Sequence, residues 1–363
     1  MLRAAEIEIV LAGFWRGDTP PAELGGVPVL ALGRTFDGAF LRRAASSLGR
    51  AMFPASILPE AARADLLMAR NLEMLSIAVS VRRKLGCTVP VVYEVLDIHR
   101  LLVSNHPIAR ALREFERGLL RDVDLLVTSS PAFLREYFEP QQFAHRALPS
   151  AIVENKFLCL EDSVAHKKAP LPAGPPWRIA WLGILRCRRS LEILGGLARR
   201  RPDLVEIRLS GRPTDELRRD LEPHLRTAPG LEFSGAYHPA DLARLYGEAH
   251  FNWAIDYFEE GMNSRWLLPN RIYEGGYHDA VSLALAGTET ANWLNEHGIG
   301  VSFRNPETDL EQFLESLTPS AYTGMKGACR QAPRSVFAAT ADDCVRLREH
   351  LENVMRPSLR AVS

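Results

Sequence analysis

A regular alternation of short apolar runs with longer helical segments is the feature that most constrains how this chain folds. Each apolar run is rich in valine, isoleucine and leucine and has the length of one strand. Strands that alternate with helices are typical of parallel sheets, because two parallel neighbours need a crossover connection. The sequence therefore predicts an α/β protein built from doubly wound parallel sheets.

The alternation occurs twice, and residues 161–176 separate the two series. In this stretch proline, glycine and charged residues replace the apolar runs, which is typical of a linker between domains. A chain of 363 residues is long enough for two domains that each bury a core. We therefore expect an N-terminal domain at 1–160, a linker at 161–176, a second domain at 177–335 and a C-terminal helix at 336–363.

The strands expected in each domain follow from these apolar runs, and the helices from the segments between them. In the first domain we expect strands at 7–12, 27–32, 65–69, 89–96, 124–128 and 151–153, with helices near 36–50, 71–85, 107–121 and 131–138. In the second we expect strands at 177–182, 205–210, 231–233, 249–255, 281–286 and 298–303, followed by helices over 307–355.

Charge and cysteine content exclude several classes of protein. The chain carries 44 Lys and Arg against 44 Asp and Glu, so a basic surface for nucleic acid is not expected. Its 5 cysteines include no Cys-x-x-Cys pair, which is typical of a reducing compartment and argues against a zinc site. The sequence shows neither a signal-peptide pattern nor the roughly 18–20 apolar residues that span a bilayer. We expect a cytoplasmic protein, either free or peripheral on the inner face of the cytoplasmic membrane.

Residues 34–53 have the pattern of a basic amphipathic helix. Phe40, Ala44, Leu48 and Met52 form an apolar stripe, and the segment holds four arginines against one aspartate. Such a helix can bind an anionic membrane surface. A core-facing helix with a solvated side has the same pattern, so both interpretations remain open.

Residues 268–274 have the pattern of a helix start that can bind a nucleotide. Pro269 suits the first turn, where a missing N–H costs nothing. A helix N-terminus attracts phosphate through its free N–H groups and its dipole, and Glu274, about one turn further on, can accept hydrogen bonds from ribose hydroxyls. We expect Gly275 and Gly276 to loosen this helix. A solvated glutamate followed by two packing glycines is the alternative interpretation.

A second polar cluster follows the strand expected at 177–182. Gly183 comes directly after this strand, and Arg186, Arg188 and Arg189 open the next helix. Amide groups at a helix start and the planar guanidinium group of arginine both suit phosphate oxygens. The cluster indicates a diphosphate site, and a solvated arginine-rich helix face is the alternative.

Ionisable residues occur at the end of the strand expected at 89–96. Ligands of open α/β sheets bind at the carboxyl ends of strands, and Glu94, Asp97 and His99 occur at such an end. An aspartate directed into a binding site can act as a base on a hydroxyl or stabilise a charged intermediate. A turn-capping role for Asp97 and a surface position for His99 are the structural alternatives.

The first expected strand leads into a loop at 13–17. This loop lacks the G-x-G-x-x-G spacing, so it does not predict dinucleotide binding or a nicotinamide oxidoreductase. Trp15 and Arg16 in this loop have side chains that can stack on a sugar and donate hydrogen bonds to it. Trp15 can equally be a packing residue beneath the loop.

The segment Pro269-Asn270-Arg271-Ile272-Tyr273-Glu274, with Asp279-Ala280-Val281 after it, resembles the donor-binding helix of GT-B glycosyltransferases, in particular retaining family 4. The resemblance is strongest over 177–303, and it extends to enzymes of succinoglycan-type exopolysaccharide assembly. It implies two Rossmann-like domains that face each other across a cleft, with a final helix that returns to the N-terminal domain. Many members have a second glutamate eight residues before the ribose-binding one, where this chain has Trp266.

The resemblance also implies roles for the candidate residues. The implied donor-binding set is Gly183, Arg186 and Arg189 for the diphosphate, Tyr237 near the nucleobase, and Asn270 and Glu274 on the donor helix. The implied acceptor-binding residues are Trp15 and Arg16. Asp97 corresponds to an acceptor-side or catalytic carboxylate, and His99 and Glu94 are the other catalytic candidates.

These features predict a glycosyltransferase that moves a sugar from a nucleoside-diphosphate sugar to a hydroxyl of an oligosaccharide acceptor in bacterial surface polysaccharide synthesis, and we expect this acceptor to be lipid-linked. We expect no metal cofactor, since the Asp-x-Asp motif at 122–124 precedes its strand and arginines and helix dipoles can stabilise the leaving diphosphate. Two alternatives remain open. One is a sugar-nucleotide epimerase of the same fold, and the other is a non-catalytic nucleotide-sugar-binding subunit, which the absent first glutamate favours.

Overall fold

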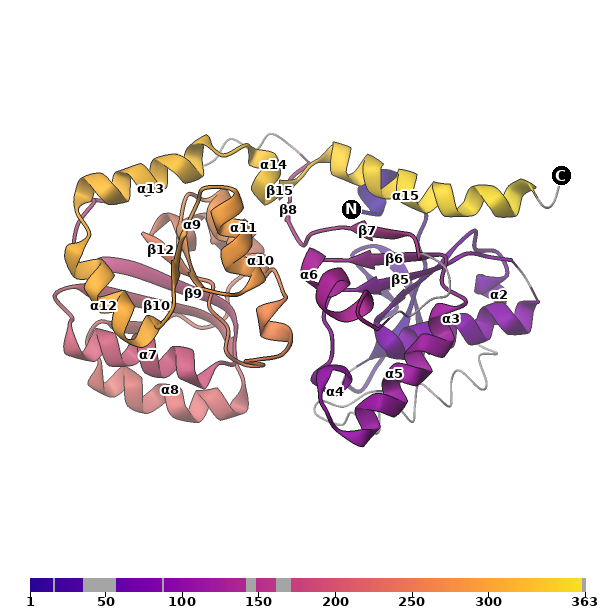
Figure 1. Cartoon of the computed structure of the whole chain (residues 1–363), viewed down its shortest axis with the longest axis horizontal. Coiled ribbons are helices and arrows are strands. Elements are labelled where there is room, and N and C mark those ends of the chain that lie inside the picture. The colour runs from indigo at the N-terminus through magenta and orange to yellow at the C-terminus, as the bar shows by residue number, and fades with distance from the viewer. Residues whose placement is uncertain (16, 35–56, 87, 142–147, 161–170, 361–363) are drawn as a thin grey trace. The chain divides into compact units, whose positions relative to one another are not determined.

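The computed structural model describes residues 1–15, 17–34, 57–86, 88–141, 148–160 and 171–360. Contacts between Cα atoms divide the chain into two compact units. Unit 1 comprises Met1–Glu154 and Ala341–Ser363, and unit 2 comprises Asn155–Thr340. Figure 1 labels their elements. Arg16, the amphipathic helix predicted within 34–53 and most of the predicted linker lie outside the described residues.

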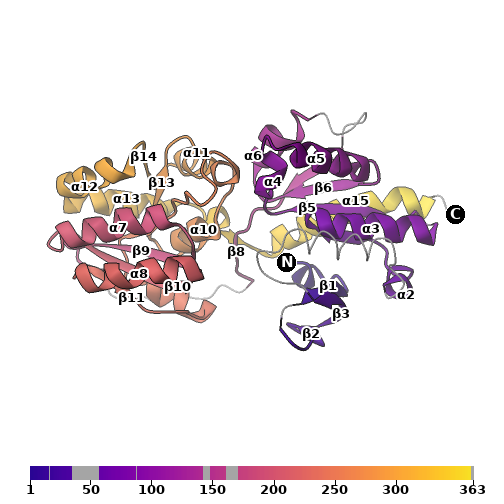
Figure 2. The ribbon, with the colours of Figure 1, turned by 90° about the horizontal axis from the view of Figure 1, so that it is seen from below.

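The described residues of unit 1 form two sheets instead of the single sheet expected. Four parallel strands follow the order β4-β5-β6-β7, and a separate small sheet has the order β1-β3-β2, with β2 antiparallel to β3. Figure 2 shows the small sheet apart from β5 and β6. The strands of unit 1 are β1 (Leu11–Trp15), β2 (Glu23–Leu24), β3 (Val27–Arg34), β4 (Leu67–Arg70), β5 (Val91–Val95), β6 (Leu125–Thr128) and β7 (Ser150–Ile152). Its helices are η1 (Arg3–Ala5), α2 (Leu58–Ala61), α3 (Asn71–Leu85), α4 (Arg100–Val103), α5 (Pro107–Leu120), α6 (Pro131–Phe133), the π-helical turn η2 (Leu134–Phe138) and α15 (Ala341–Arg360).

The first strand is shifted along the chain from its expected position. The strand predicted at 7–12 is β1, Leu11–Trp15, and the loop predicted at 13–17 is therefore wrong for its first three residues. Phe14 and Trp15 have the aromatic side chains that favour strands, and the pairing register shifts between Gly13 and Phe14, so the glycine permits the strand to continue. The indole N–H of Trp15 is buried and has no hydrogen-bond partner among the described residues.

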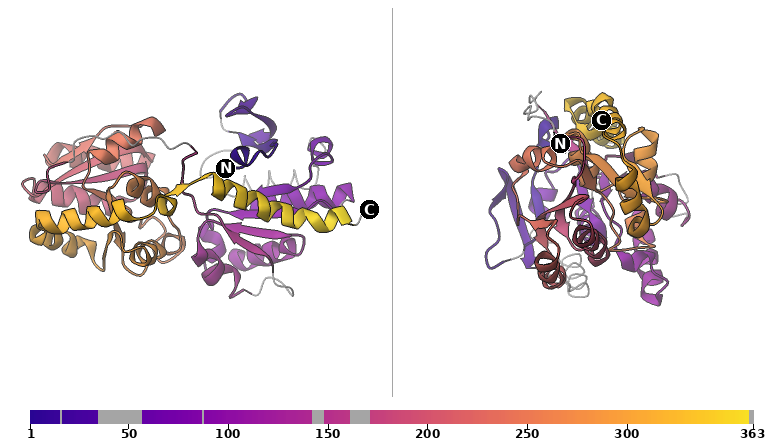
Figure 3. Two further views of the ribbon diagram at one scale, coloured as in Figure 1. Left: turned by 90° about the horizontal axis from the view of Figure 1, so that it is seen from above. Right: turned by 90° about the vertical axis from the view of Figure 1, so that its left-hand side faces the viewer.

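Two helices cover opposite faces of the four-stranded sheet. Side chains alternate between the faces of a strand, so Val92 and Tyr93 of β5 point in opposite directions. Val92 packs with Leu347 and Leu351 of α15, and Tyr93 meets Glu116 of α5. Figure 3 shows α15 running along unit 1. Apolar side chains of α15 thus contribute to the core of unit 1.

Glu116 is a carboxyl group in the interior of unit 1. Its side chain is 1% exposed and accepts hydrogen bonds from the hydroxyls of Tyr93, at 2.8 Å, and Tyr137 on the π-helical turn η2. Burial raises the pKa of Glu116 to about 7, although both tyrosine hydrogen bonds favour the charged form. The folded protein therefore retains a proton at a pH where the unfolded chain releases it.

We expect the stability of unit 1 to fall as pH rises from about 4.5 to about 7, because the folded-state pKa of Glu116 lies above the unfolded value of 4.5. The contribution of Glu116 to the free energy of unfolding is fully present below pH 4.5 and is lost as pH rises through the folded-state pKa. The total loss is about 3 kcal/mol. Urea unfolding of Glu116→Gln at pH 5 and pH 8 should remove that pH dependence. Glu114→Gln, an exposed glutamate on the same helix, is the matched control. An unchanged pH dependence in Glu116→Gln would refute the assignment.

In unit 2, the part of the chain that the structure describes forms a six-stranded parallel sheet with the order β11-β10-β9-β12-β13-β14. A further two-stranded parallel sheet joins β8 to β15, near the two points where the chain passes between units. The strands of unit 2 are β8 (Phe157–Leu158), β9 (Trp177–Leu185), β10 (Val205–Pro213), β11 (Leu231–Phe233), β12 (Phe251–Trp253), β13 (Val281–Leu285), β14 (Val301–Phe303) and β15 (Ala338–Ala339). Its helices are α7 (Arg188–Arg200), α8 (Asp215–Thr227), η3 (Pro239–Asp241), α9 (Leu242–Gly247), η4 (Asn263–Arg265), α10 (Asn270–Tyr277), α11 (Glu289–Glu296), α12 (Pro306–Ser316), α13 (Pro319–Gln331) and α14 (Arg334–Phe337).

The six-stranded sheet is covered on both faces. Along β9, Trp181 points into the cluster that contains Leu191 and Leu194 of α7, while its neighbour Leu182 points into the cluster that contains Tyr246 of α9. Neighbouring strand residues face opposite sides, so α7 and α9 lie on different faces of the sheet. The sheet is therefore doubly wound, as the alternation of strands and helices predicts.

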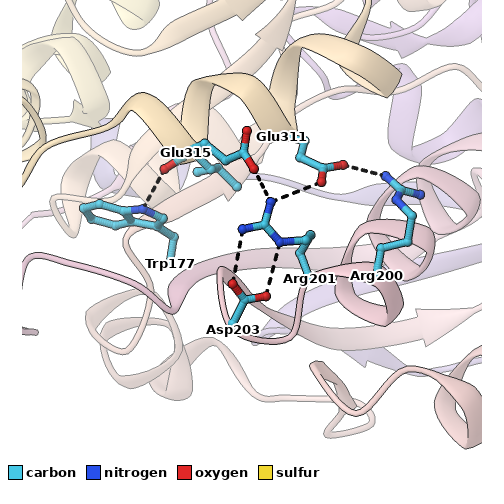
Figure 4. A network of polar contacts seen from close by, with 7 residues as sticks. Trp177, Arg200, Arg201, Asp203, Glu311 and Glu315 are labelled. Carbon is cyan, nitrogen blue, oxygen red and sulfur yellow. Dashed lines mark hydrogen bonds and ion pairs between the residues drawn. The ribbon is translucent and has the colours of Figure 1, made fainter.

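A network of charged side chains joins the C-terminal end of α7 to α12 (Figure 4). Arg201 pairs with Asp203 at 3.2 Å and with Glu315, and Arg200 pairs with Glu311 at 2.9 Å. Beside this network the indole N–H of Trp177 donates to the carbonyl oxygen of Leu314 at 3.2 Å. The contacts fix α12 against the amino-terminal end of β9, at the edge of the sheet opposite the site described below.

Two local expectations for unit 2 are wrong. The strand predicted to end before Gly183 continues to Leu185, because Gly183 still pairs with Gly211 of β10. Gly275 and Gly276 do not loosen their helix but lie within α10. A Cβ atom on Gly275 would lie 2.7 Å from the Asn252 amide nitrogen, and one on Gly276 would overlap the ring of Phe337. These glycines therefore permit close packing of a continuous helix.

Candidate functional site

The strand order of unit 2 identifies one edge of its sheet as the place for a ligand. From β9 the chain proceeds outward through β10 and β11, and then returns to β12 on the other side of β9 and proceeds to β13 and β14. Ligands of open α/β sheets bind at the carboxyl ends of the strands where this reversal occurs. At the β9–β12 reversal this edge carries residues 186–189, residues 254–269 and the N-terminal ends of α7 and α10.

Glycines bring the backbones of β9 and β10 close together at this edge. Gly183 and Gly211 are paired, and both have left-handed φ angles, +108° and +142°. A Cβ atom on Gly211 would overlap the carbonyl oxygen of Gly183, so a side chain cannot be accommodated there. The Gly211 N–H donates to the carbonyl oxygen of Gly235 at 2.7 Å. The close packing at this edge therefore requires a glycine at Gly211, whereas a Cβ atom on Gly183 would meet nothing within 4 Å.

Arg186 is held by the segment that follows β12. Its guanidinium group pairs with the carboxylate of Asp256 at 3.0 Å and lies over the ring of Phe258, 4.6 Å from the ring centre. The Asp256 side chain is only 6% exposed and also accepts the backbone N–H of Phe258 at 2.8 Å. Asp256 was not identified from the sequence, although its position directly after an expected strand was a usable signal.

Arg189 lies in the first turn of α7 and is more exposed. Its Nη1 contacts both carboxylate oxygens of Glu260, at 2.8 and 2.9 Å, and its Nε donates to Glu307 at 2.9 Å. The guanidinium group lies 4.3 Å from the centre of the Tyr257 ring. The two arginines predicted for the diphosphate thus occur at the same edge of the sheet, and each has an acidic partner.

Helix α10 is attached to β12 by buried hydrogen bonds. Pro269 is the residue before the first helical turn, and Asn270 begins the helix in an exposed position. The buried Asn252 amide donates to the carbonyl oxygen of Arg271 at 2.6 Å and to Ser282 at 3.1 Å. This anchoring sets the position of the helix that carries Glu274, and it was not foreseen because Asn252 occurs inside an apolar strand.

Glu274 lies among aromatic side chains on the second turn of α10. The buried Tyr246 hydroxyl donates to its carboxylate at 3.4 Å. Burial raises the pKa of Glu274, and the Tyr246 hydrogen bond and the Arg271 charge oppose this only in part. Burial and the Glu274 charge also raise the pKa of the half-buried Tyr237. The structure thus brings two predicted donor-site residues, Glu274 and Tyr237, into one electrostatic environment.

The predicted catalytic residues all belong to unit 1. Glu94 lies in β5 and pairs with Arg70 at 2.5 Å. Asp97 follows β5 and is exposed, and the His99 ring accepts the backbone N–H of Leu101 at 3.3 Å as the cap of α4. Asp97 and His99 therefore occupy the carboxyl end of the strand, as expected. His99 has the capping role that the sequence offered as an alternative for Asp97.

The described residues show two absences, which concern metal binding and membrane insertion. They contain no group of three or more His, Cys, Asp or Glu side chains arranged to hold a metal ion. Within the same residues, no helix has the length and apolar character needed to cross a membrane.

Comparison with known proteins identifies relatives. Residues 1–148 match the family model described as "Glycosyl transferase 4-like domain". The chain is 43% identical to the succinoglycan biosynthesis protein ExoL of Rhizobium meliloti (strain 1021) over 328 residues, which is 88% of this chain and 81% of that protein.

Solved structures show the same fold at low sequence identity. Sucrose-phosphate synthase from Thermosynechococcus elongatus superposes with a TM-score of 0.70 at 13% identity and covers 100% of this chain and 91% of its own. Anabaena Alr3699/HepE, solved in complex with UDP and glucose, superposes with a TM-score of 0.64 at 16% identity. The match covers 90% of this chain and 86% of the Anabaena chain. These similarities confirm the predicted fold class of two Rossmann-like α/β domains.

Proposed function

Since the chain belongs to the family of glycosyltransferases with a glycosyl transferase 4-like domain, we propose that unit 2 binds the nucleotide-sugar donor at the carboxyl edge of β9 and β12. The observation that carries this proposal is the position of α10 and α7 at the strand reversal. Their N-terminal ends lie at the edge of the sheet where such folds bind nucleotides. Glu274 and Arg189 supply the two groups that a ribose and a diphosphate need.

Each candidate residue has a role that fits its chemistry. The Glu274 carboxylate accepts hydrogen bonds from the ribose hydroxyls, and the guanidinium group of Arg189 binds phosphate oxygens. During transfer the bond between the sugar and the diphosphate breaks, so negative charge accumulates on the leaving diphosphate. Arg189 and the N–H groups at the helix starts stabilise that charge. Tyr237 and Asn270 border the same site and complete the donor-binding set.

The acceptor side belongs to unit 1 in this proposal. Trp15, Arg16, Asp97 and His99 are the candidates that the sequence supplies, and Asp97 is the strongest catalytic candidate because it is exposed at a strand end. Glu94 is less accessible, because its side chain is 14% exposed and pairs with Arg70. The relative ExoL takes part in succinoglycan biosynthesis. We therefore propose a lipid-linked oligosaccharide of an exopolysaccharide as the acceptor.

A panel of nucleoside diphosphates and nucleotide sugars tests the donor site. Thermal unfolding of the full chain is followed with uridine, adenosine, guanosine, cytidine and thymidine diphosphates and their glucose conjugates. A ligand at one hundred times its dissociation constant stabilises the folded protein by about 2.7 kcal/mol. We expect one base to stabilise the protein, as UDP is bound in the Anabaena structure. If no nucleotide stabilises the folded protein, the proposed donor site is wrong.

We also propose that unit 1 contacts the membrane that holds such an acceptor. On α5, Ile108 and Phe115 are 48% and 40% exposed and lie seven residues apart, hence on the same face of the helix. Arg110 and Arg121 are exposed near the two ends of the same helix. An exposed apolar stripe with neighbouring basic residues is the pattern of a helix that lies on an anionic lipid surface.

Sedimentation with lipid vesicles tests the membrane contact. We expect the protein to pellet with vesicles that contain phosphatidylglycerol and not with phosphatidylcholine alone. Replacing Ile108 and Phe115 with serine should weaken this binding by about tenfold or more, because both side chains lose apolar contact with lipid. Val345→Ser, on the exposed face of α15, is the matched control. Equal sedimentation of both variants would exclude α5 as the contact surface.

A further inference from the structure

The two arginines at the edge of unit 2 differ in how firmly they are held. One loop, residues 256–260, supplies an aromatic ring and a carboxylate to each of them. Asp256 is 6% exposed and also accepts a backbone N–H of its own loop, so its pair with Arg186 is part of the folded core of the loop. Arg186 therefore acts mainly to hold this loop in place.

The pair between Arg189 and Glu260 has the opposite character. The side chains are 40% and 54% exposed, and the second partner, Glu307, is 50% exposed. Exposed ion pairs contribute little to stability because water solvates each charge when the pair opens. Another anion can therefore replace these glutamates on Arg189 at a small cost in free energy.

The Glu260 carboxylate contacts the Arg189 guanidinium group in the way that a phosphate would. Both of its oxygens contact Nη1 of Arg189, while Glu307 accepts from Nε. Carboxylate and phosphate oxygens use the same charge-assisted contacts with arginine. A diphosphate that binds Arg189 through Nη1 or Nε, the atoms that the glutamates contact, must consequently displace at least one of them.

We propose that Glu260 sets the affinity of the donor site by competing with the donor diphosphate for Arg189. Glu260 pairs with Arg189 in the free protein and leaves it when the nucleotide binds. After transfer, Glu260 returns to Arg189 and favours release of the nucleoside diphosphate. This inference rests on the proposed function, because it assigns the diphosphate to Arg189.

Calorimetric titration of the full chain with the five nucleoside diphosphates named above tests the competition. Glu260→Gln keeps the shape of the side chain and removes its charge. We expect it to bind the preferred nucleoside diphosphate about two- to fivefold more tightly than the wild type, which is the range that an exposed ion pair accounts for. The matched control is Glu192→Gln, which removes the carboxylate paired with Arg188 on the same helix and should leave the affinity unchanged.

The same substitution made in the Arg189→Ala protein shows whether Arg189 mediates the tighter binding of Glu260→Gln. In Arg189→Ala the nucleotide should bind more weakly, and adding Glu260→Gln should then produce no tightening. If the wild type binds a nucleoside diphosphate but Glu260→Gln binds it equally or more weakly, the competition is refuted while the donor site stands. If neither protein binds any of the five, the proposed function itself fails.

Discussion

Replacing Gly211 with alanine is expected to destabilise unit 2 by about 4 kcal/mol. The new Cβ atom would overlap the carbonyl oxygen of Gly183, a backbone atom that cannot move without breaking the pairing of β9 with β10. The φ angle of +142° adds backbone strain for any residue with a side chain. Strain of this kind costs about 1–3 kcal/mol, and overpacking costs a similar amount.

Chemical denaturation followed by tryptophan fluorescence measures this loss, because Trp177, Trp181 and Trp253 are buried in unit 2. The matched control is Gly324→Ala in α13, where a Cβ atom meets nothing within 4 Å. Alanine is a better helix former than glycine, so this control should be neutral or more stable by up to about 1 kcal/mol. A Gly211→Ala protein as stable as the wild type would show that β9 and β10 are not in close contact at this edge.

Replacing Glu274 with glutamine is expected to weaken donor binding by about 10- to 100-fold. A hydrogen bond to a charged group contributes about 1.5–3 kcal/mol, and the neutral amide accepts ribose hydroxyls less strongly. The stability of the free protein should be unchanged or slightly higher, because burial disfavours the charged form of Glu274. Loss of affinity without loss of stability distinguishes a binding role from a structural one.

The pH dependence of binding provides an internal check on this variant. The raised pKa of Glu274 means that donor affinity should fall as pH decreases through that pKa, since the ionised carboxylate accepts ribose hydroxyls more strongly than the protonated acid does. Glu274→Gln should lose this acid-side decrease. Glu296→Gln, an exposed glutamate on α11, should behave as the wild type. An identical pH profile in wild type and Glu274→Gln would exclude the ribose role.

Much of the fold follows from periodicity in the sequence. The strands of unit 2 and helices such as α3 and α5 appear close to their predicted positions, because their apolar residues have the spacing that burial requires. The errors occur where tertiary contacts decide the outcome. Gly275 and Gly276 have poor helix propensity, yet they stay helical because α10 packs against Asn252 and Phe337, so closely that a side chain at either glycine would not fit.

The candidate site was predictable to a smaller extent. Glu274, Arg186 and Arg189 could be identified because their residue types follow expected strands or begin expected helices. Their partners could not be identified, since Asp256, Glu260 and Glu307 come from distant segments that only the fold brings to the arginines. The buried contact of Glu116 with Tyr93 and Tyr137 was missed for the same reason.

Hydrogen exchange of the full chain, with and without the nucleoside diphosphate that stabilises it most, tests the location of the donor site most directly. Bound nucleotide should slow amide exchange at the start of α7 and along α10, because its phosphate and ribose occupy those groups. We predict protection in peptides that cover 186–192 and 270–277. Protection confined to unit 1, or binding that leaves both of these peptides unchanged, would contradict a donor site at the β9–β12 edge.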